Sequence, residues 1–307
     1  MISFTRPRTD GPLSWIEPMP TQVKLEPKHF FESLPTLDHR TGDIWRSLPS
    51  FGLVGTDVVG GIVITPACDL ANRKSETATY LPIVPIATYL GSAAYRYECW
   101  LEIQGALSKL KASDQVTPPN RFENPLVDEV EAVCTALDSA KRESAAGKQV
   151  LAYLTYLRDC ASGRAPAIGT IEQLLTAKRL QDTLSRLITN ALKPDVHFLP
   201  ADGSPKDYSA VHTHSLALFR YALSIPVEIL DAAQRVSPDG WPAVREGMAL
   251  IHPIARHFTD WPVKLGALKD DFLSDLLSRY VSMYIRLGSR DFTSQTVAEI
   301  SDNVRGS

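Results

Sequence analysis

The stretch that decides the fold is GGIVITPACDLANRKSETATYLPIVP, residues 60–85, in which two apolar runs flank a short polar segment. Residues 60–65 are rich in β-branched side chains, and residues 78–87 alternate before they become wholly apolar. Turn-forming residues fill the polar segment between these two runs. The stretch therefore predicts a β-hairpin with an extended polar tip, whose second strand is buried on both faces.

The residues before and after this hairpin predict a mixture of strands and helices. Six prolines in the first 40 residues predict an extended arm that packs over the core or over a partner. Residues 42–45 predict a short strand. The spacing of apolar residues then predicts a block of helices, with one at 98–111 and others that begin at Leu126, near Val150 and at Thr170, before Pro194 ends the block.

Strands are predicted to resume after the helical block. Residues 196–199 predict one strand, and residues 209–223 fit either a strand or a helix. Alternation around His212 and His214 favours a strand in the first half of that segment. A short helix is expected at 226–233 and a long helix at about 268–287.

Composition excludes several classes of function. The chain of 307 residues has a net charge of −3, so nothing in its overall charge favours nucleic acid or an anionic membrane. No apolar run approaches the roughly 18 residues of a membrane span, and the N-terminus lacks the apolar core of a signal peptide. We therefore expect a cytoplasmic protein with no membrane partner.

Motifs that define common enzyme and cofactor sites are missing from the sequence. There is no phosphate-binding GxxxxGK[ST] loop, no GxGxxG, no HExxH and no GxSxG. Cysteines stand at 68, 99, 134 and 160, without a CxxC pair, which predicts free thiols. We expect no cofactor.

Cys68 and Asp69 are the candidate catalytic residues. A thiol at the end of a strand, beside a carboxylate, is suited to act as a nucleophile, a redox sensor or a metal ligand. The structural alternative is that Cys68 fills a small apolar gap and Asp69 caps the turn. Arg73 and Lys74 follow at the hairpin tip and are the candidate nucleic-acid-binding residues, because their charges suit phosphate.

His212 and His214 are the candidate metal ligands. Alternate residues of a strand face the same way, so both imidazoles are able to reach one metal ion. The spacing fixes no third ligand, and a pair of surface histidines is the alternative.

Three short motifs resemble those of the MazF/PemK toxin family. They are GDIW at 42–45, GGIVI at 60–64 and PIVPIAT at 82–88, and a second block, SLALFR at 215–220 followed by Ile225-Pro226, resembles the end of that family's barrel. The resemblance implies a small β-barrel interrupted by the helical block.

Departures from the family pattern bear on activity. In that family, RNA cleavage is attributed to an arginine at the start of the second strand and to a threonine or serine at the end of the third. Gly60 or Gly61 takes the first position here and Ala87 takes the second, with Thr88 one residue later. Glycine cannot stabilise charge on a phosphate as a guanidinium does. The resemblance therefore implies a barrel without the toxin's activity.

The predicted fold class is α+β: a small, partly open barrel of about five strands, interrupted by a helical insertion and closed by a C-terminal helix. The predicted divisions are a proline-rich arm at 1–40, the first part of the barrel at 41–97, the helical insertion at 98–194, and the remaining strands and C-terminal helices at 195–307.

The predicted function is that of a non-catalytic interaction module in a bacterial stress or phage-defence system. A protein partner is expected, while nucleic acid and self-association are left open. The first alternative is an enzyme, either a divergent ribonuclease or a thiol enzyme that uses Cys68. The second is a metal-dependent sensor that uses His212 and His214.

Overall fold

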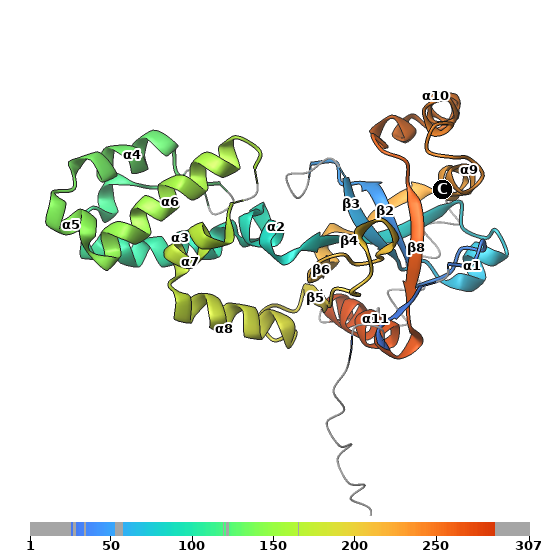
Figure 1. The fold of residues 1–307 in the computed structure, drawn as a ribbon, viewed down its shortest axis with the longest axis horizontal. Coiled ribbons are helices and arrows are strands. Elements are labelled where there is room, and N and C mark those ends of the chain that lie inside the picture. The colour runs from blue at the N-terminus through green and yellow to red at the C-terminus, as the bar shows by residue number, and fades with distance from the viewer. Residues whose placement is uncertain are drawn as a thin grey trace, which may run out of the picture.

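The protein consists of one antiparallel β-sheet and a lobe of helices that projects to one side of it (Figure 1). This arrangement confirms the predicted α+β class. The computed structural model describes residues 26, 29–33, 35–52, 58–118, 120, 123–164 and 166–285. Most of the predicted arm therefore lies outside the described residues.

The sheet has eight strands in the order β1-β8-β2-β3-β4-β6-β5, with β7 paired to β4. It is open, with β1 and β5 at its ends, and it has more strands than the roughly five that the sequence predicts. The strands are β1 (Phe31–Glu32), β2 (Asp43–Pro49), β3 (Val58–Val63), β4 (Thr77–Pro85), β5 (Val196–Leu199), β6 (Ser215–Leu218), β7 (Leu223–Pro226) and β8 (Val263–Leu268).

The helices fall into the lobe between β4 and β5 and a smaller set around the sheet. The lobe contains α2 (Ile86–Gly91), α3 (Ala93–Lys109), α4 (Val127–Ala136), α5 (Ser139–Glu143), α6 (Ala145–Ala161), α7 (Ile168–Leu175) and α8 (Ala177–Ile188). The others are α1 (Ala67–Ala71), α9 (Val227–Gln234), α10 (Trp241–Ile251) and α11 (Asp270–Ile285). Short 3-10 helices are η2 (Ser113–Gln115), η3 (Lys206–Tyr208), η4 (Phe219–Tyr221) and η5 (Pro253–His257).

The predicted hairpin is confirmed as β3 and β4. The two strands are antiparallel neighbours, with Ile62 opposite Leu81 and Val63 opposite Tyr80. Their connection is not the extended polar tip that the sequence suggests, because α1 forms there directly after Pro66. A proline at the start of a helix loses no intrahelical hydrogen bond, which favours helix at this point.

Both faces of β4 are buried, as predicted, because helices cover the sheet from two sides. On one face Trp45 and Tyr80 belong to the same apolar core as Ile229 of α9. On the other face Leu81 packs in a second core with Leu276 of α11. Figure 1 shows α9 and α10 on one side of the sheet and α11 on the other.

Pro82 lies within this buried strand, although proline cannot donate a hydrogen bond to a neighbour. β4 changes partner at this point. Thr77 to Tyr80 pair with β7, and Ile83 to Pro85 pair with β6. Pro82 lies between the residues that pair with β7 and those that pair with β6, so its missing N–H removes no hydrogen bond from either pairing.

Strand β8 was not predicted from the sequence, nor was helix α10. β8 pairs with β2 and β1, so it lies inside the sheet, in a segment to which the sequence analysis assigns neither helix nor strand. Lys264 is the second residue of this otherwise uncharged strand and hides the strand pattern. Its ammonium group is buried against a carboxylate from β2, a partner that is 221 residues away.

Gly61 is needed for close packing in the centre of the sheet. A β-carbon at this position would lie 2.6 Å from Leu48 Cδ1 and 2.7 Å from Tyr80 Cδ2. Tyr80 has little room to move, because its hydroxyl donates to the carbonyl oxygen of Pro49 at 2.5 Å. Packing alone is thus enough to explain a glycine at this position.

We expect Gly61→Ala to lower the free energy of unfolding by about 1–3 kcal/mol, the usual cost of overpacking a core. Gly60→Ala is the matched control, because its β-carbon would meet Ile83 Cβ at 3.3 Å and needs a much smaller adjustment. Urea denaturation of both variants measures the difference. Equal stabilities would show that Gly61 is not sterically required.

Candidate functional site

Cys68 and Asp69 lie together on α1, at the surface. The Cys68 side chain is exposed, and its Sγ donates to Asp69 Oδ1 over 3.6 Å. A carboxylate does not stabilise a thiolate as a nearby cation does. Asn72 caps the same turn by donating to the carbonyl oxygen of Cys68 at 2.7 Å. The contacts describe a hydrogen-bonded surface turn.

Arg73 and Lys74 follow directly and are exposed. Arg73 has a φ of 51°, which ends the helical turn, and the Lys74 amide donates to the carbonyl oxygen of Asp69 at 2.8 Å. The pair therefore presents two exposed cations directly after α1. Their role in binding nucleic acid stays a prediction.

His212 and His214 are not on a strand, which corrects the interpretation of 209–215. β6 begins only at Ser215, and both histidines precede it in an irregular segment. His214 Nδ1 accepts from the Ala201 amide at 3.0 Å, and its ring lies 5.8 Å from that of Phe198. The described residues contain no group of three or more His, Cys, Asp or Glu placed to hold a metal ion.

Asp202 explains why this segment is a compact loop. Its carboxylate accepts from the Ser204 amide, the Ser209 hydroxyl and the Ala210 amide at 2.7–2.8 Å, and from the Val211 amide at 3.3 Å. Burial acts to raise the pKa of Asp202, but these hydrogen bonds outweigh it and hold the pKa below its usual range. The loop joins β5 to β6 and carries His214.

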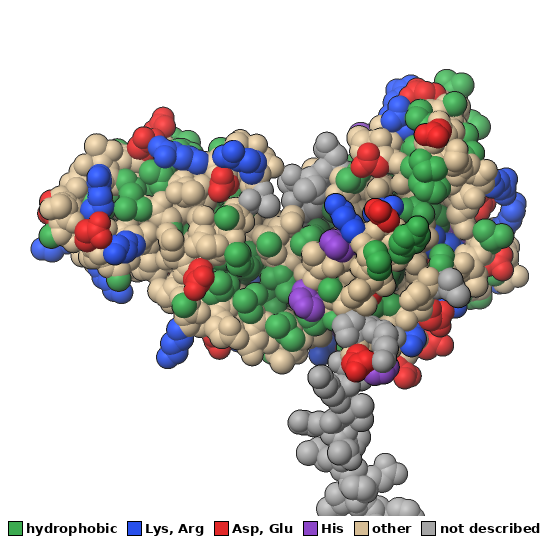
Figure 2. Space-filling view, in the orientation of Figure 1, with side chains coloured by type: hydrophobic (Ala, Val, Ile, Leu, Met, Phe, Trp, Pro, Cys, Tyr) green, Lys and Arg blue, Asp and Glu red, His purple; other side chains and the backbone are tan. Residues whose placement is uncertain are grey.

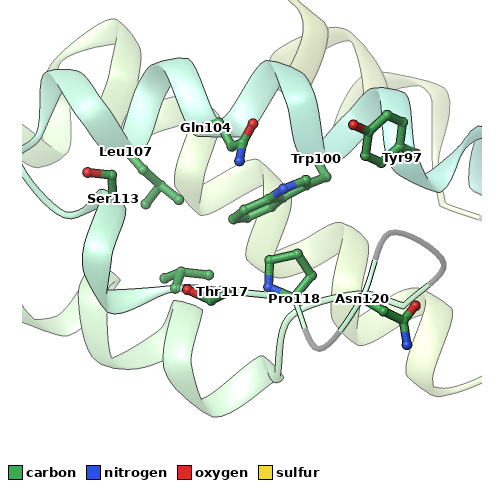
Figure 3. Close-up of a pocket in the computed structure, with 9 residues that line it drawn as sticks. Tyr97, Trp100, Gln104, Leu107, Ser113, Thr117, Pro118 and Asn120 are labelled. Atoms are coloured by element: carbon green, nitrogen blue, oxygen red, sulfur yellow. The ribbon is translucent and has the colours of Figure 1, made fainter.

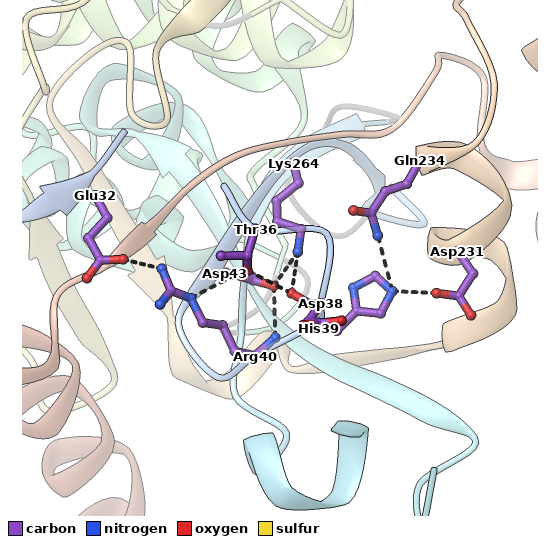
Figure 4. A network of polar contacts seen from close by, with 9 residues as sticks. All are labelled: Glu32, Thr36, Asp38, His39, Arg40, Asp43, Asp231, Gln234 and Lys264. Carbon is purple, nitrogen blue, oxygen red and sulfur yellow. Dashed lines mark hydrogen bonds and ion pairs between the residues drawn. The ribbon is translucent and has the colours of Figure 1, made fainter. Parts of the chain in front are cut away.

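A buried polar network ties β2 to β8 (Figure 4). Lys264 Nζ donates to Asp43 Oδ2 at 3.0 Å and to the carbonyl oxygen of Asp38 at 2.7 Å. Asp43 is 1% exposed and Lys264 is 7% exposed. Burial raises the pKa of Asp43, and the neighbouring lysine opposes that shift. Arg40 joins through its amide, which donates to Asp43 Oδ2 at 2.9 Å, and its guanidinium binds Glu32.

His39 extends the network to α9. Its Nε2 lies 2.9 Å from Asp231 Oδ1 and 3.4 Å from Gln234 Nε2, and its ring lies 5.7 Å from Trp45. Figure 4 shows His39 pointing toward α9 while Lys264, Asp43 and Arg40 converge on the loop before β2. Among the described residues, His39 Nδ1, Arg40 Nε and Asp43 Oδ1 are buried without a hydrogen-bond partner, and the last two form an ion pair at 3.6 Å. The remaining contacts link the loop before β2 to β8 and to α9.

A first pocket, of about 390 Å³, lies on the helical lobe between α3 and the segment after η2 (Figure 3). Trp100 and Tyr97 form one wall, and Thr117 and Pro118 lie opposite. Trp100 is only 7% exposed and its ring lies 6.4 Å from that of Tyr153. Trp100 therefore belongs to the core of the lobe, whereas Tyr97 is 43% exposed.

A second pocket, of about 540 Å³, lies where the lobe meets the sheet, and we call it the junction pocket. The sheet side and its loops contribute Phe30, Phe198, Pro200 and His214. The helical side contributes Ile86, Ala87, Ile168, Leu184 and Ile188. None of these nine side chains carries a permanent charge. Figure 2 shows hydrophobic side chains gathered between the lobe and the sheet.

Short connections hold the walls of the junction pocket in place. The Ile86 amide donates to the carbonyl oxygen of His214 at 3.1 Å, which ties α2 to the loop before β6. On the β5 side, the Phe198 amide donates to Asn190 Oδ1 at 2.6 Å. Arg279 of α11 in turn donates to the carbonyl oxygen of Asn190 at 3.3 Å. These bonds close the edge of the sheet beside the pocket.

The predicted helix that begins at Thr170 is divided in two, and this division shapes the pocket. Thr176 has a φ of 68°, which separates α7 from α8, and its side chain accepts from the Arg179 amide. Positive φ is unusual for a β-branched residue, so helical periodicity alone gave no sign of the break. α8 then runs back toward β5 (Figure 1), and Leu184 and Ile188 line the pocket.

Of the residues predicted to be functional, His214 lines the junction pocket. Cys68 and Asp69 lie elsewhere on α1, and the contacts of His214 are with Phe198 and Ala201. Most of the apolar residues of the pocket fall in segments that the sequence predicts as helix, strand or arm. No motif marks them, because they come together only through the fold.

Comparison with protein families, with curated proteins and with solved structures finds no match to this chain. In the described part of the chain, no helix has both the length and the hydropathy that a membrane crossing requires.

Lys264→Met should lower the free energy of unfolding by about 3–5 kcal/mol, because it removes the buried cation that hydrogen-bonds to Asp43 and leaves only Arg40, whose Nε lies 3.6 Å from Asp43 Oδ1. The double variant Asp43→Asn/Lys264→Met should recover much of this loss. The matched control is Arg158→Ala, which breaks an exposed pair with Glu131 at 2.9 Å and should cost no more than about 1 kcal/mol. A double variant no more stable than Lys264→Met would contradict this account.

The Asp202 loop should make a pH-dependent contribution to stability. The pKa of Asp202 is lower in the folded protein than in the unfolded chain. Its contribution to the free energy of unfolding is therefore fully present at pH values above the ordinary Asp range, and it is lost as the pH falls through the folded-state pKa. Asp202→Ala should cost roughly 1–2 kcal/mol near pH 7 and progressively less below about pH 4. Thermal unfolding from pH 2 to 7 measures this, with Asp207→Ala of the same loop as control. A cost that stays constant with pH would refute the assignment.

Proposed function

We propose that this protein is a non-catalytic protein-binding module and that its partner binds at the junction pocket. The observation that supports the proposal is the pocket itself, an apolar cavity of about 540 Å³ that opens between two parts of the fold. Ile168 and Ile188, on its helical side, are 50% and 49% exposed. Apolar side chains gathered around a concave surface favour burial by a partner.

The chemistry of the pocket favours an apolar ligand. Its walls hold aliphatic and aromatic side chains, and the imidazole of His214 is the polar side chain among them. An unpaired charge placed there would lose its water without gaining a partner, whereas an aromatic or branched side chain would gain contact on several sides. A short apolar segment of a protein fits these walls.

The placement of the predicted catalytic residues is a second argument for binding. Cys68 contacts Asp69 on a surface turn, and His214 faces the junction pocket. In the part of the chain described here, no histidine hydrogen-bonds to Cys68, and its side-chain partner is the Asp69 carboxylate, so the Cys–His pair of a typical thiol enzyme is not formed. We therefore keep the thiol enzyme and the divergent ribonuclease as weaker alternatives.

Ile188→Asp should abolish partner binding, because it buries a carboxylate in an apolar contact. The matched control is Val281→Asp on α11, where the wild-type side chain is 48% exposed and is not one of the residues that line the pocket. The full-length protein is used as bait in cells of its native host, with cross-linking, and the captured protein is identified and then purified.

Calorimetry with the purified partner then gives the dissociation constants of both variants. We expect Ile188→Asp to weaken binding by at least about 30-fold, equivalent to about 2 kcal/mol, and Val281→Asp to change it less than about threefold. Circular dichroism verifies that both variants are folded. Equal affinities of the two variants would place the binding surface elsewhere and reject the proposal.

A further inference from the structure

The described chain enters the fold at the border of the junction pocket. Phe30 lines the pocket, and its ring stacks on Phe272 of α11 with centroids 4.0 Å apart. Its carbonyl oxygen accepts from the Lys269 amide at 2.9 Å. Phe30 is therefore fixed from two directions, and the residues that precede it in the sequence are tethered beside the pocket.

The arm carries an apolar segment that matches the pocket in chemistry. Residues 12–16 read PLSWI and have no charge, while Asp10 and Glu17 stand on either side. The pocket likewise has no permanently charged side chain among its lining residues. A tryptophan and an isoleucine supply the large apolar surface that a cavity of this kind excludes from water.

The tether is long enough for this segment to reach the pocket. At roughly 3.3 Å per residue, the chain from Trp15 to Phe30 can span about 50 Å. The entropy cost of closing such a loop grows only slowly with its length. A tethered segment of this length also has an effective concentration near the millimolar range, so even a weak contact is substantially populated.

We propose that residues 12–16 of the arm bind in the junction pocket of the same chain and block it until a partner displaces them. This inference rests on the proposed function, because it assigns a competing ligand to the same site. The arm is then an internal regulator of binding: a partner must compete with it, and removal of the Trp15 side chain must raise the partner's apparent affinity.

A disulfide-trapping experiment in the full-length protein tests the contact without any partner. In a Cys68→Ser background, which removes the exposed thiol, Trp15→Cys is combined with Ile188→Cys. The control combines Trp15→Cys with Val281→Cys, because Val281 and Ile188 are 48% and 49% exposed. Both proteins are oxidised at low concentration, and the rate at which the intramolecular disulfide forms is followed on non-reducing gels.

We expect the Ile188 pair to form the intramolecular disulfide at least tenfold faster than the Val281 pair. Equal rates for the two pairs would overturn the proposal, and so would disulfide-linked dimers without an intramolecular product. If such dimers formed with the Ile188 pair but not with the Val281 pair, the pocket would bind the arm of a second copy. Because Trp15→Cys removes the indole, Trp15 fluorescence is measured separately, as the difference between wild type and Trp15→Phe. Its emission should move to longer wavelength in Ile188→Asp but not in Val281→Asp.

The two proposals fail in different ways. If the disulfide does not form and Ile188→Asp still abolishes partner binding, the arm is not the internal ligand but the pocket remains the binding surface. If the disulfide forms and Ile188→Asp leaves partner binding unchanged, the arm covers a pocket that no partner uses. In that case regulation by the arm is rejected together with the proposed function.

Discussion

The buried pair of Asp43 and Lys264 is the interaction on which the arrangement of the sheet depends. A single charge in this position would be strongly unfavourable, so β2 and β8 are stable in the core only when they meet. Their pairing places Trp45 opposite Lys264, and the lysine also holds the carbonyl oxygen of Asp38. Asp43 also accepts from the Arg40 amide in the loop before β2, and His39 of the same loop contacts Asp231 of α9.

The second constraint is that the helical lobe leaves the sheet and returns to it within a small area. β4 ends at Pro85 and α2 begins at the next residue, while α8 ends at Ile188, shortly before β5. Hydrogen bonds of Ile86 with His214 and of Phe198 with Asn190 hold both connections. The lobe and the sheet, joined in this way, leave the junction pocket as a recess between them, because neither surface is flat. The recess is apolar, since it continues the cores on each side.

The central hairpin and most helices of the lobe could be predicted from periodicity alone. β3, β4, α4 and α6 occur where apolar spacing places them, since in each of them local pattern and tertiary packing agree. β8 was not predicted because a lysine is stable in a buried strand only beside a carboxylate, and the sequence does not show that Asp43 is that partner. The strand expected around His212 is wrong because the hydrogen bonds of Asp202 favour a loop over a ladder.

The sequence by itself determined the α+β class, the hairpin at the centre of the sheet and the presence of a helical block, because these follow from short-range spacing of apolar residues. Only the tertiary structure decided the strand order, the pairing of Asp43 with Lys264 and the junction pocket. Each of these joins residues that are far apart in the chain, and no local pattern records which distant partner a side chain will meet. The pocket is the clearest example, since its walls are ordinary core residues until the lobe and the sheet are brought together.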